Sequence, residues 1–471
     1  MLLRLPKSGA GASLPRRSTL TDDPPRAAWR ALLAAAAAAL VLFAWLPAFG
    51  APYQFDDYNT PVGDAASQSL TSFWHLLPRT LRPLTKLTYA LESSLGADSA
   101  PARRVLNALL FAACVGLLKA LIQSTAKLPA ALALLIASAW AVHPVHAETI
   151  VALAGRPVLL SLLLMLGSAL CLTRARPGPA LGLAMLALLA RESALPWACA
   201  CAALVAHARR VSAKRIALAG ALALAVGVLV LLGSSGVRSL LASTFAAGGA
   251  WNRLGLQWAA LTRGTCLLFI DPAAFTPDME FEPLGFARLA SILTTAALYA
   301  GAAWLALKQP RLRLFAVLWL CLVLPTHSVA PKLDVLTARP FSASLAPLLG
   351  LAACAAGPWL AQASRRQAGV TLLLAGAFLV SFAMTRHRAA LYTDSIALWR
   401  DAAERTVHKV RPLVNLGTLL ARQGQLRAAE RALSSAVERD PTNVDASLRR
   451  HRVRRALALQ LEKKPTPLPS P

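Results

Sequence analysis

Long apolar runs recur along most of this 471-residue chain and constrain its fold more than any other feature. The first run covers residues 28–49, and a helix needs about 20 predominantly apolar residues to cross a bilayer. Hydrophobic residues make up 56% of the chain and charged residues only 15%, a balance typical of proteins with many membrane spans. The sequence therefore predicts an all-α, polytopic membrane helical bundle rather than a soluble domain.

A basic tail, residues 1–27, precedes this first run. The tail and the start of the run contain Arg4, Lys7, Arg16, Arg17, Arg26 and Arg30. The run is too long and begins too far along the chain for a cleavable signal peptide, and no clear small-residue cleavage site follows it. Because basic residues beside a first span favour the cytoplasmic side, we expect the tail in the cytoplasm and the next loop outside.

The other apolar runs allow the membrane topology to be predicted. They cover approximately 104–122, 129–143, 157–173, 178–191, 193–208, 215–233, 251–270, 286–307, 312–330, 341–361 and 369–386. The basic clusters all remain cytoplasmic only if 251–270 does not cross, and its Arg253 and Arg263 indicate an amphipathic helix at the outer surface. We therefore predict a membrane domain over 28–389 with about 11 spans and a C-terminus outside.

The net charge of +27 would favour nucleic acid as a partner if this were a soluble domain. Many Lys and Arg residues here lie in short loops, where they determine topology and contact anionic lipid head groups. No zinc-finger or RNA-binding motif occurs, so we expect the lipid bilayer as partner and no nucleic acid. The seven cysteines show neither metal-ligand nor disulfide spacing, and we expect them to be small core residues.

Asp56 and Asp57 form an acidic pair in the segment YQFDDYNT, just after the first run. Two like charges beside the hydrocarbon boundary are costly and are more often functional than structural. Taken alone, Asp56 has a second interpretation, as the cap of a following helix. The pair lies near the start of an outer loop, 50–103, in which 69–77 and 81–96 should form short amphipathic helices on the membrane face.

Three further outward-facing patches carry charged or titratable side chains. They are the cations Arg79, Arg82 and Lys86, the segment HPVHAETIVALAGR with His143, His146, Glu148 and Arg156, and the pair Arg191-Glu192 between two short runs. The histidines are either interfacial residues or metal ligands without a clear third partner. The Arg191-Glu192 pair either links two helices or lines a water-filled dip. Together, carboxylates and arginines on one membrane face favour a site that binds a phosphate and activates a nucleophile.

From about residue 390 the chain becomes polar, and residues 411–441 fit one tetratricopeptide repeat. The characteristic positions are occupied in order by Leu416, Gly417, Leu420, Ala429, Leu433, Ala436 and Pro441. One and a half repeats fall short of the roughly three that are stable alone. We therefore expect 390–460 to dock on the membrane domain or on a protein partner, and the tail 461–471 to be disordered.

Several of these motifs resemble a known family when they are taken together. The segments FDDYNT, RPLTKLTYALE, HPVHAETIVALAGR and ARESA and the trailing repeat are similar to those of bacterial relatives of the transmembrane-and-tetratricopeptide O-mannosyltransferases. These belong to the GT-C superfamily of polyprenyl-phosphate-sugar-dependent glycosyltransferases. The resemblance runs from about 28 to 441, and this chain departs from the family in having a shortened repeat region.

The resemblance implies transfer of mannose or another hexose from a polyprenyl-phosphate donor to an acceptor hydroxyl, on a protein Ser/Thr or on a glycan. Asp56 would be the general base, with Asp57 as its partner or alternate. Arg82, Lys86, Arg156 and Arg191 would hold the donor phosphate, and His143, His146, Glu148 and Glu192 would support the site. Direct displacement would invert the anomeric carbon. No cofactor and no metal site are assigned.

Two other classes of function stay open beside the glycosyltransferase. A transporter or flippase of a lipid-linked or anionic substrate would show paired halves with interrupted helices, and no convincing internal repeat is found. A non-catalytic membrane scaffold would leave the acidic loop unexplained. The Ala/Leu-rich composition and the preference for Arg over Lys suggest a GC-rich bacterium, which predicts an inner-membrane protein with its active site and C-terminal repeat region in the periplasm.

Overall fold

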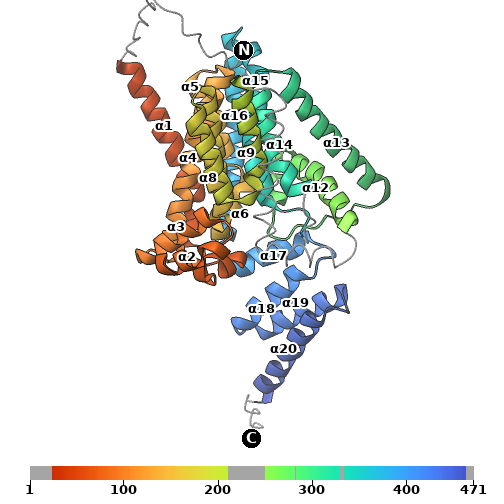
Figure 1. The fold of residues 1–471 in the computed structure, drawn as a ribbon. Coiled ribbons are helices and arrows are strands. Elements are labelled where there is room, and N and C mark those ends of the chain that lie inside the picture. Colours follow the sequence, from red (N-terminus) through yellow and green to blue (C-terminus); the bar gives the residue numbers. More distant parts are fainter. Residues whose placement is uncertain (1–23, 210–249, 282, 329–333, 463–471) are drawn as a thin grey trace, which may run out of the picture.

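The computed structural model describes residues 24–209, 250–281, 283–328 and 334–462, and the regular structure in these ranges is entirely helical (Figure 1). This confirms the all-α prediction for the described part of the chain. The predicted span 215–233 lies outside the described residues, as do residues 1–23 of the basic tail and 463–471 at the C-terminus. Helix α20 (Val444–Glu462) continues through residues 461 and 462, the first two residues of the predicted tail.

Five helical segments are long and apolar enough to cross a membrane, as a multi-pass membrane protein requires. They are α4 (Ala100–Ala126), the segment Leu153–Thr173 with α7 (Arg156–Thr173), α13 (Gly285–Lys308), α15 (Ala338–Leu360) and α16 (Ser364–Leu391). A sixth span results if α5 (Ala130–Ala141) and Pro144–Val151, which are bent by 53°, cross together. Shorter apolar helical stretches are Ala35–Gly50, which includes the end of α1 (Pro24–Trp45), α8 (Pro177–Ala190) and α14 (Arg313–Ser328). Helix α9 (Leu195–Ala208) follows α8. The number of spans therefore remains a prediction.

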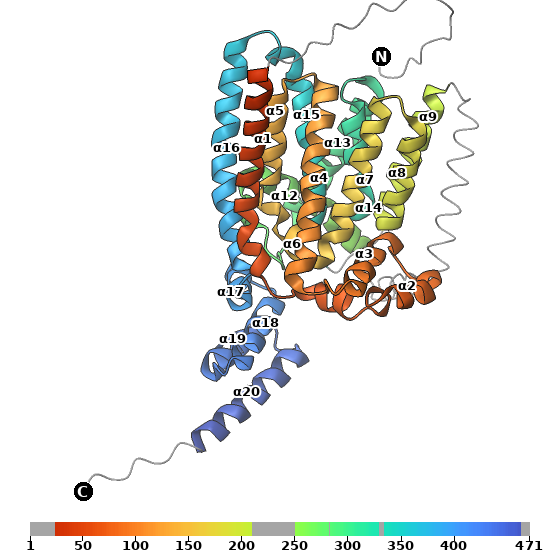
Figure 2. The ribbon, with the colours of Figure 1, turned by 90° about the vertical axis from the view of Figure 1, so that its left-hand side faces the viewer.

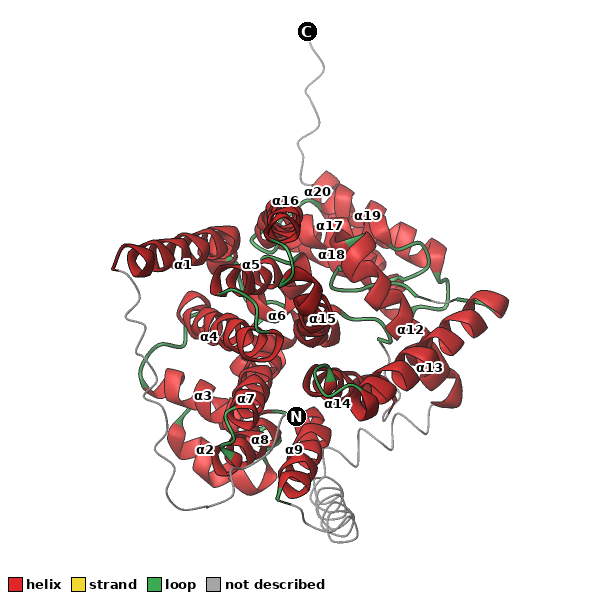
Figure 3. Ribbon diagram, turned by 90° about the horizontal axis from the view of Figure 1, so that it is seen from above, coloured by secondary structure: helices red, strands yellow, loops and turns green. Residues whose placement is uncertain are grey.

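The inner helices of the bundle pack closely, whereas the outer ones expose apolar faces. Seen along the bundle, α4 lies against α5, α7 and α15 (Figure 3). In the second half, Gly350 of α15 faces the ring of Phe315 in α14 so closely that an added Cβ would lie 2.2 Å from it. Small residues permit this close approach between membrane helices. Helices α13 and α16 instead expose large side chains such as Leu293 and Leu373, as lipid-facing helices do.

The loop after α1 forms the two short helices that the sequence predicts. Helix α2 (Leu70–Leu76) begins at Ser69, whose hydroxyl accepts a hydrogen bond from the Ser72 amide, 3.1 Å away. Helix α3 (Pro83–Ser94) begins with a proline in its first turn, where no amide hydrogen is needed. Both helices lie across the end of the bundle from which the C-terminal helices also project (Figure 2). Helix α12 (Ala250–Ile270) covers the predicted amphipathic segment.

The C-terminal region consists of α17 (Ser395–Arg405), α18 (Arg411–Arg422), α19 (Leu426–Arg439) and α20. Helices α18 and α19 form a tight hairpin, because a Cβ on Gly417 would lie 2.6 Å from the Leu433 side chain. Ion pairs dock this region on the membrane domain. The Asp278 carboxylate lies 2.7 Å from Lys409 Nζ and 2.5 Å from Arg411 Nε. The predicted docking is therefore present, while the assignment of the hairpin to the tetratricopeptide family stays a prediction.

Replacing Asp278 with Asn should loosen α18–α20 without unfolding the membrane domain. The buried Asp278 carboxylate is a partner of both Lys409 and Arg411, so we expect the docked state to lose about 1–3 kcal/mol. Amide hydrogen exchange in α18–α20 should become faster. Asp445→Asn is the control, because it breaks only an exposed pair with Arg449 and should change little. Unchanged exchange in Asp278→Asn would contradict the role of this contact.

Candidate functional site

The acidic pair is divided by the fold, because Asp57 is fully buried while Asp56 is exposed. The Asp57 carboxylate accepts hydrogen bonds from the amides of Gln54, at 2.9 Å, and Ala154, at 2.8 Å. The bond from Ala154 joins the loop after α1 to the segment that precedes α7. Burial raises the pKa of Asp57, against the hydrogen bonds and the positive charges of Arg104 and Arg339. Asp57 therefore has a structural role, because its buried carboxylate holds two backbone segments together.

Arg104 strengthens the same junction from the first turns of α4. Its side chain is buried, and its guanidinium donates to the carbonyls of Ala51, Pro52 and Val151. A buried guanidinium is tolerated only when its donors are satisfied, and carbonyls from two loops satisfy this one. The loop that carries Asp56 is therefore held in place against the second outer loop.

Asp56 lies in a cluster that combines two carboxylates and one guanidinium. Arg339, at the start of α15, has its Nη1 3.1 Å from Asp56 Oδ2 and its Nε 2.9 Å from Glu148 Oε1. The Asp56 side chain is 57% exposed, against 20% for Arg339. The structure thus brings together Asp56 and Glu148, which the sequence placed in separate loops, through an arginine that was not among the predicted site residues.

A second ion pair lies beside this cluster. Arg82 donates two hydrogen bonds to the Glu192 carboxylate, from Nε at 2.8 Å and from Nη2 at 2.6 Å. Arg82 itself has φ +57° and ψ +52°, a left-handed conformation that is costly for a residue with a side chain. Pro83 disfavours the right-handed alternative at this position. The two hydrogen bonds to Glu192 hold the guanidinium of Arg82 in place.

Arg191 is adjacent to this pair but makes no hydrogen bond through its Nε, which is buried. The pKa of Arg191 falls to about 10, first because burial disfavours the charged form and then because Arg82 repels it. The positive charge of Arg339 also lowers the pKa of Arg191, by less than Arg82 does. Burial opposes ionisation of Glu192, but Arg82 and Arg191 outweigh it and lower the pKa of that carboxyl to about 2.

Three buried polar atoms in this group have no hydrogen-bond partner. They are Arg191 Nε, Arg339 Nε and Glu148 Oε2. Arg339 Nε is close to Glu148 Oε1 but is not oriented to form a hydrogen bond. Unsatisfied buried groups are rare in folded proteins and often mark places where a ligand binds. We refer to Asp56, Arg82, Glu148, Arg191, Glu192 and Arg339 as the outer charged cluster.

Other predicted site residues lie apart from the outer charged cluster. Lys86 pairs with Asp64 at 2.7 Å. Arg156 is fully buried and donates to Asn107 at 2.8 Å and to Glu92 at 2.7 Å. Its guanidinium also lies 4.2 Å from the centre of the Tyr89 ring and donates to two further oxygens, those of the Thr88 side chain and the Arg103 backbone. Arg156 therefore joins α3, α4 and α7, and its predicted role in donor binding is not supported by this geometry.

The two histidines are also interior residues. His143 Nε2 lies 2.8 Å from the Leu268 carbonyl, and its Nδ1 accepts from the Val145 amide. His146 lies between the Ser342 hydroxyl and the Trp140 carbonyl, each at 2.7 Å. The hydrogen bonds of both rings are made to residues outside the outer charged cluster. In the described part of the chain, no three His, Cys, Asp or Glu side chains are arranged to hold a metal ion.

No family model, curated protein or solved structure matches this chain. The outer charged cluster and the motifs of the sequence are therefore the two features that bear on function. Arg339 is the residue that sequence reasoning missed as a site residue. Its only signal was a cation before a long apolar run on the outer side, and that signal is shared by several other arginines.

Replacing Asp57 with Asn should destabilise the protein, whereas Asp56→Asn should not. The substitution replaces one carboxylate oxygen, which accepts a hydrogen bond, with an NH₂ group that faces a backbone N–H. This should lower the free energy of unfolding by about 1–3 kcal/mol. We expect a lower midpoint of thermal unfolding for Asp57→Asn in detergent. Asp56→Asn is the matched control, because its side chain is exposed. Equal midpoints for the two variants would contradict the structural role of Asp57.

Proposed function

We propose that the protein is a membrane glycosyltransferase that moves a hexose from a polyprenyl-phosphate donor to an acceptor hydroxyl. The observation that carries this proposal is the outer charged cluster. Its exposed carboxylate, Asp56, lies beside the guanidinium of Arg339, whose buried Nε has no hydrogen-bond partner. Arginine side chains bind phosphate groups through charge-assisted, often bidentate hydrogen bonds. The resemblance of the surrounding motifs to the GT-C superfamily points to the same chemistry.

Asp56 is the general base in this mechanism. Its carboxylate takes the proton of the acceptor hydroxyl as the hydroxyl oxygen forms a bond to the anomeric carbon. The bond between that carbon and the phosphate oxygen breaks, and the electron pair leaves with the polyprenyl phosphate. Attack opposite to the leaving group inverts the anomeric carbon. Arg339 orients Asp56 through their ion pair.

The guanidiniums of Arg82, Arg191 and Arg339 stabilise the negative charge that develops on the leaving phosphate. Arg191 is the best placed of the three, because Arg82 is already paired with Glu192 and Arg339 with Asp56. Glu148 and Glu192 balance the excess positive charge and hold the arginines in position when no donor is bound. Lys86 and Arg156 take no part in this scheme.

The acceptor approaches from the side of the C-terminal helices. Gln54, three residues before Asp57, donates from Nε2 to the Tyr392 carbonyl at 3.1 Å and to the Ser395 hydroxyl at 3.3 Å. The start of α17 is therefore attached to the loop that carries the base. This proximity favours a protein Ser/Thr acceptor that the C-terminal region presents. The site and this region then lie on the periplasmic side of the bacterial inner membrane.

Asp56→Asn should abolish sugar transfer while leaving folding intact. We expect a loss of about 100-fold or more in kcat, since the variant cannot accept the proton. The measurement is transfer of label from polyprenyl-phosphate hexoses to periplasmic extract by purified full-length protein. Asp98→Asn removes an exposed carboxylate from the same outer loop and should retain activity. Full activity of Asp56→Asn would refute the proposed base, and lipid binding without transfer by wild type would favour a transporter.

Arg191→Gln should weaken donor binding by about tenfold or more, because one charge-assisted contact to the phosphate is lost. The apparent KM for the polyprenyl-phosphate sugar should rise more than that for the acceptor. Arg79→Gln is the matched control, since it removes an exposed cation from the same face outside the outer charged cluster. An unchanged donor KM in Arg191→Gln would contradict its role as a phosphate ligand.

A further inference from the structure

Helix α20 carries apolar side chains on two opposite faces. Its inner face packs on α18 and α19 through residues such as the buried Val453. Its outer face carries Val444, Leu448 and Leu459, whose exposed fractions are 69%, 53% and 49%. Helices α18 and α19 lie between α20 and the membrane domain (Figure 1). The last helix of a stack normally presents a polar outer face, so these exposed apolar side chains indicate a surface that another segment covers.

Positive charges lie on the same outer face. Residues 448, 452, 455 and 459 are three or four positions apart, a spacing that places them on one side of a helix. Arg452 and Arg455 are exposed there, with Leu448 before them and Leu459 after them. The outer face therefore combines an apolar stripe with two adjacent guanidiniums.

The charges of these two arginines are not balanced within the described part of the chain. Two other arginines of α20 have carboxylate partners, Asp445 for Arg449 and Glu430 for Arg454, each at 2.8 Å. No described residue forms an ion pair with the arginines at 452 and 455. Their positive charge is therefore available to carboxylates of a partner.

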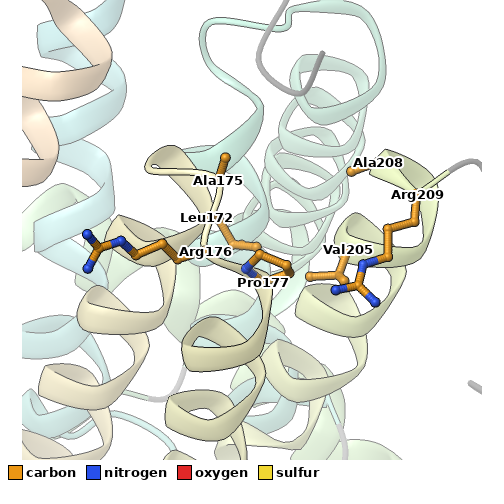
Figure 4. Close-up of a pocket in the computed structure, with 7 residues that line it drawn as sticks. All are labelled: Leu172, Ala175, Arg176, Pro177, Val205, Ala208 and Arg209. Carbon is orange, nitrogen blue, oxygen red and sulfur yellow. The ribbon is translucent and has the colours of Figure 1, made fainter. Parts of the chain in front are cut away.

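Exposed arginines elsewhere in the chain are arranged differently. Arg176 and Arg209 line a depression between the turn after α7 and the end of α9. Figure 4 shows their side chains extending to opposite sides of this depression, with apolar residues between them. On α20, by contrast, Arg452 and Arg455 are about one helical turn apart on the same side, where one partner segment can reach both.

We propose that the outer face of α20 binds an acidic amphipathic helix of another protein. Apolar side chains of that helix cover Leu448 and Leu459, and its carboxylates pair with Arg452 and Arg455. An apolar face flanked by charges is how amphipathic helices are recognised in grooves and on helical surfaces, and opposite charges fix which partner is accepted. The interaction does not depend on the proposed sugar transfer.

Two other occupants match the outer face less well. In a symmetric pair of α20 helices, the arginines in the middle of each face would meet one another, and like charges repel. The C-terminal segment 463–471 contains two lysines and four prolines but no Asp or Glu. It therefore lacks the carboxylates that the outer face calls for, and its prolines disfavour a helix.

Fluorescence anisotropy of full-length protein in nonionic detergent tests this proposal. The probe is a labelled synthetic peptide as long as α20, 19 residues, with leucines along one helical face and glutamates beside them. A matched peptide has lysines in place of the glutamates. We expect wild type to bind the glutamate peptide about tenfold more tightly than the lysine peptide. Arg452→Glu/Arg455→Glu should reverse this preference, whereas Arg427→Glu/Arg431→Glu, an equal charge change at exposed positions of α19, should preserve it.

A second variant tests the apolar part of the surface. Leu448→Ser/Leu459→Ser keeps both arginines and should weaken binding of the glutamate peptide by about tenfold, with an unchanged midpoint of thermal unfolding because both side chains are exposed. The proposal is overturned if wild type does not bind the glutamate peptide or does not prefer it, or if the two charge variants behave alike. A wild-type dimer in native mass spectrometry that the leucine variant dissociates would also overturn it, since a second copy would then cover this face.

Discussion

The end of the membrane domain that carries α2 and α3 depends on pairing charges that lie out of contact with water. Arg156 has no exposed surface, yet its donors reach Asn107, Glu92 and the backbone, so that three helices are joined at one guanidinium. Asp57 does the same for two loops with two backbone amides. A buried charge is tolerated only with such partners. The contacts of Asp57 fix the loop that carries Asp56.

The same physical rule separates structural charges from those available for chemistry. Where the fold satisfies a charged group completely, as at Arg156, a ligand has nothing to bind. Where it leaves buried donors unsatisfied, as at Arg191, an anion can complete the set. Asp56 and Asp57 are adjacent and chemically identical, but only Asp56 is accessible to an acceptor. This contrast assigns the base in the proposed mechanism.

The two ends of the membrane domain differ in how their positive charges are balanced. At the outer end, carboxylates such as Glu192 and Glu148 balance arginines within the protein, and a donor phosphate would compete for those arginines. At the other end the described chain has cations without carboxylates, and side chains of this kind attract anionic lipid head groups.

The sequence by itself determined the helical class, the apolar runs and the positions of α2, α3 and the α18–α19 hairpin, because periodicity and capping act over a few residues. It also indicated that charges gather at the outer loops. Only the tertiary structure decided which charges meet: it paired Arg339 with Asp56, 283 positions apart, enclosed Arg156 and the histidines, and separated Asp56 from Asp57. Such contacts depend on how distant helices pack and on which polar groups remain unsatisfied, and neither is encoded in the spacing along the chain.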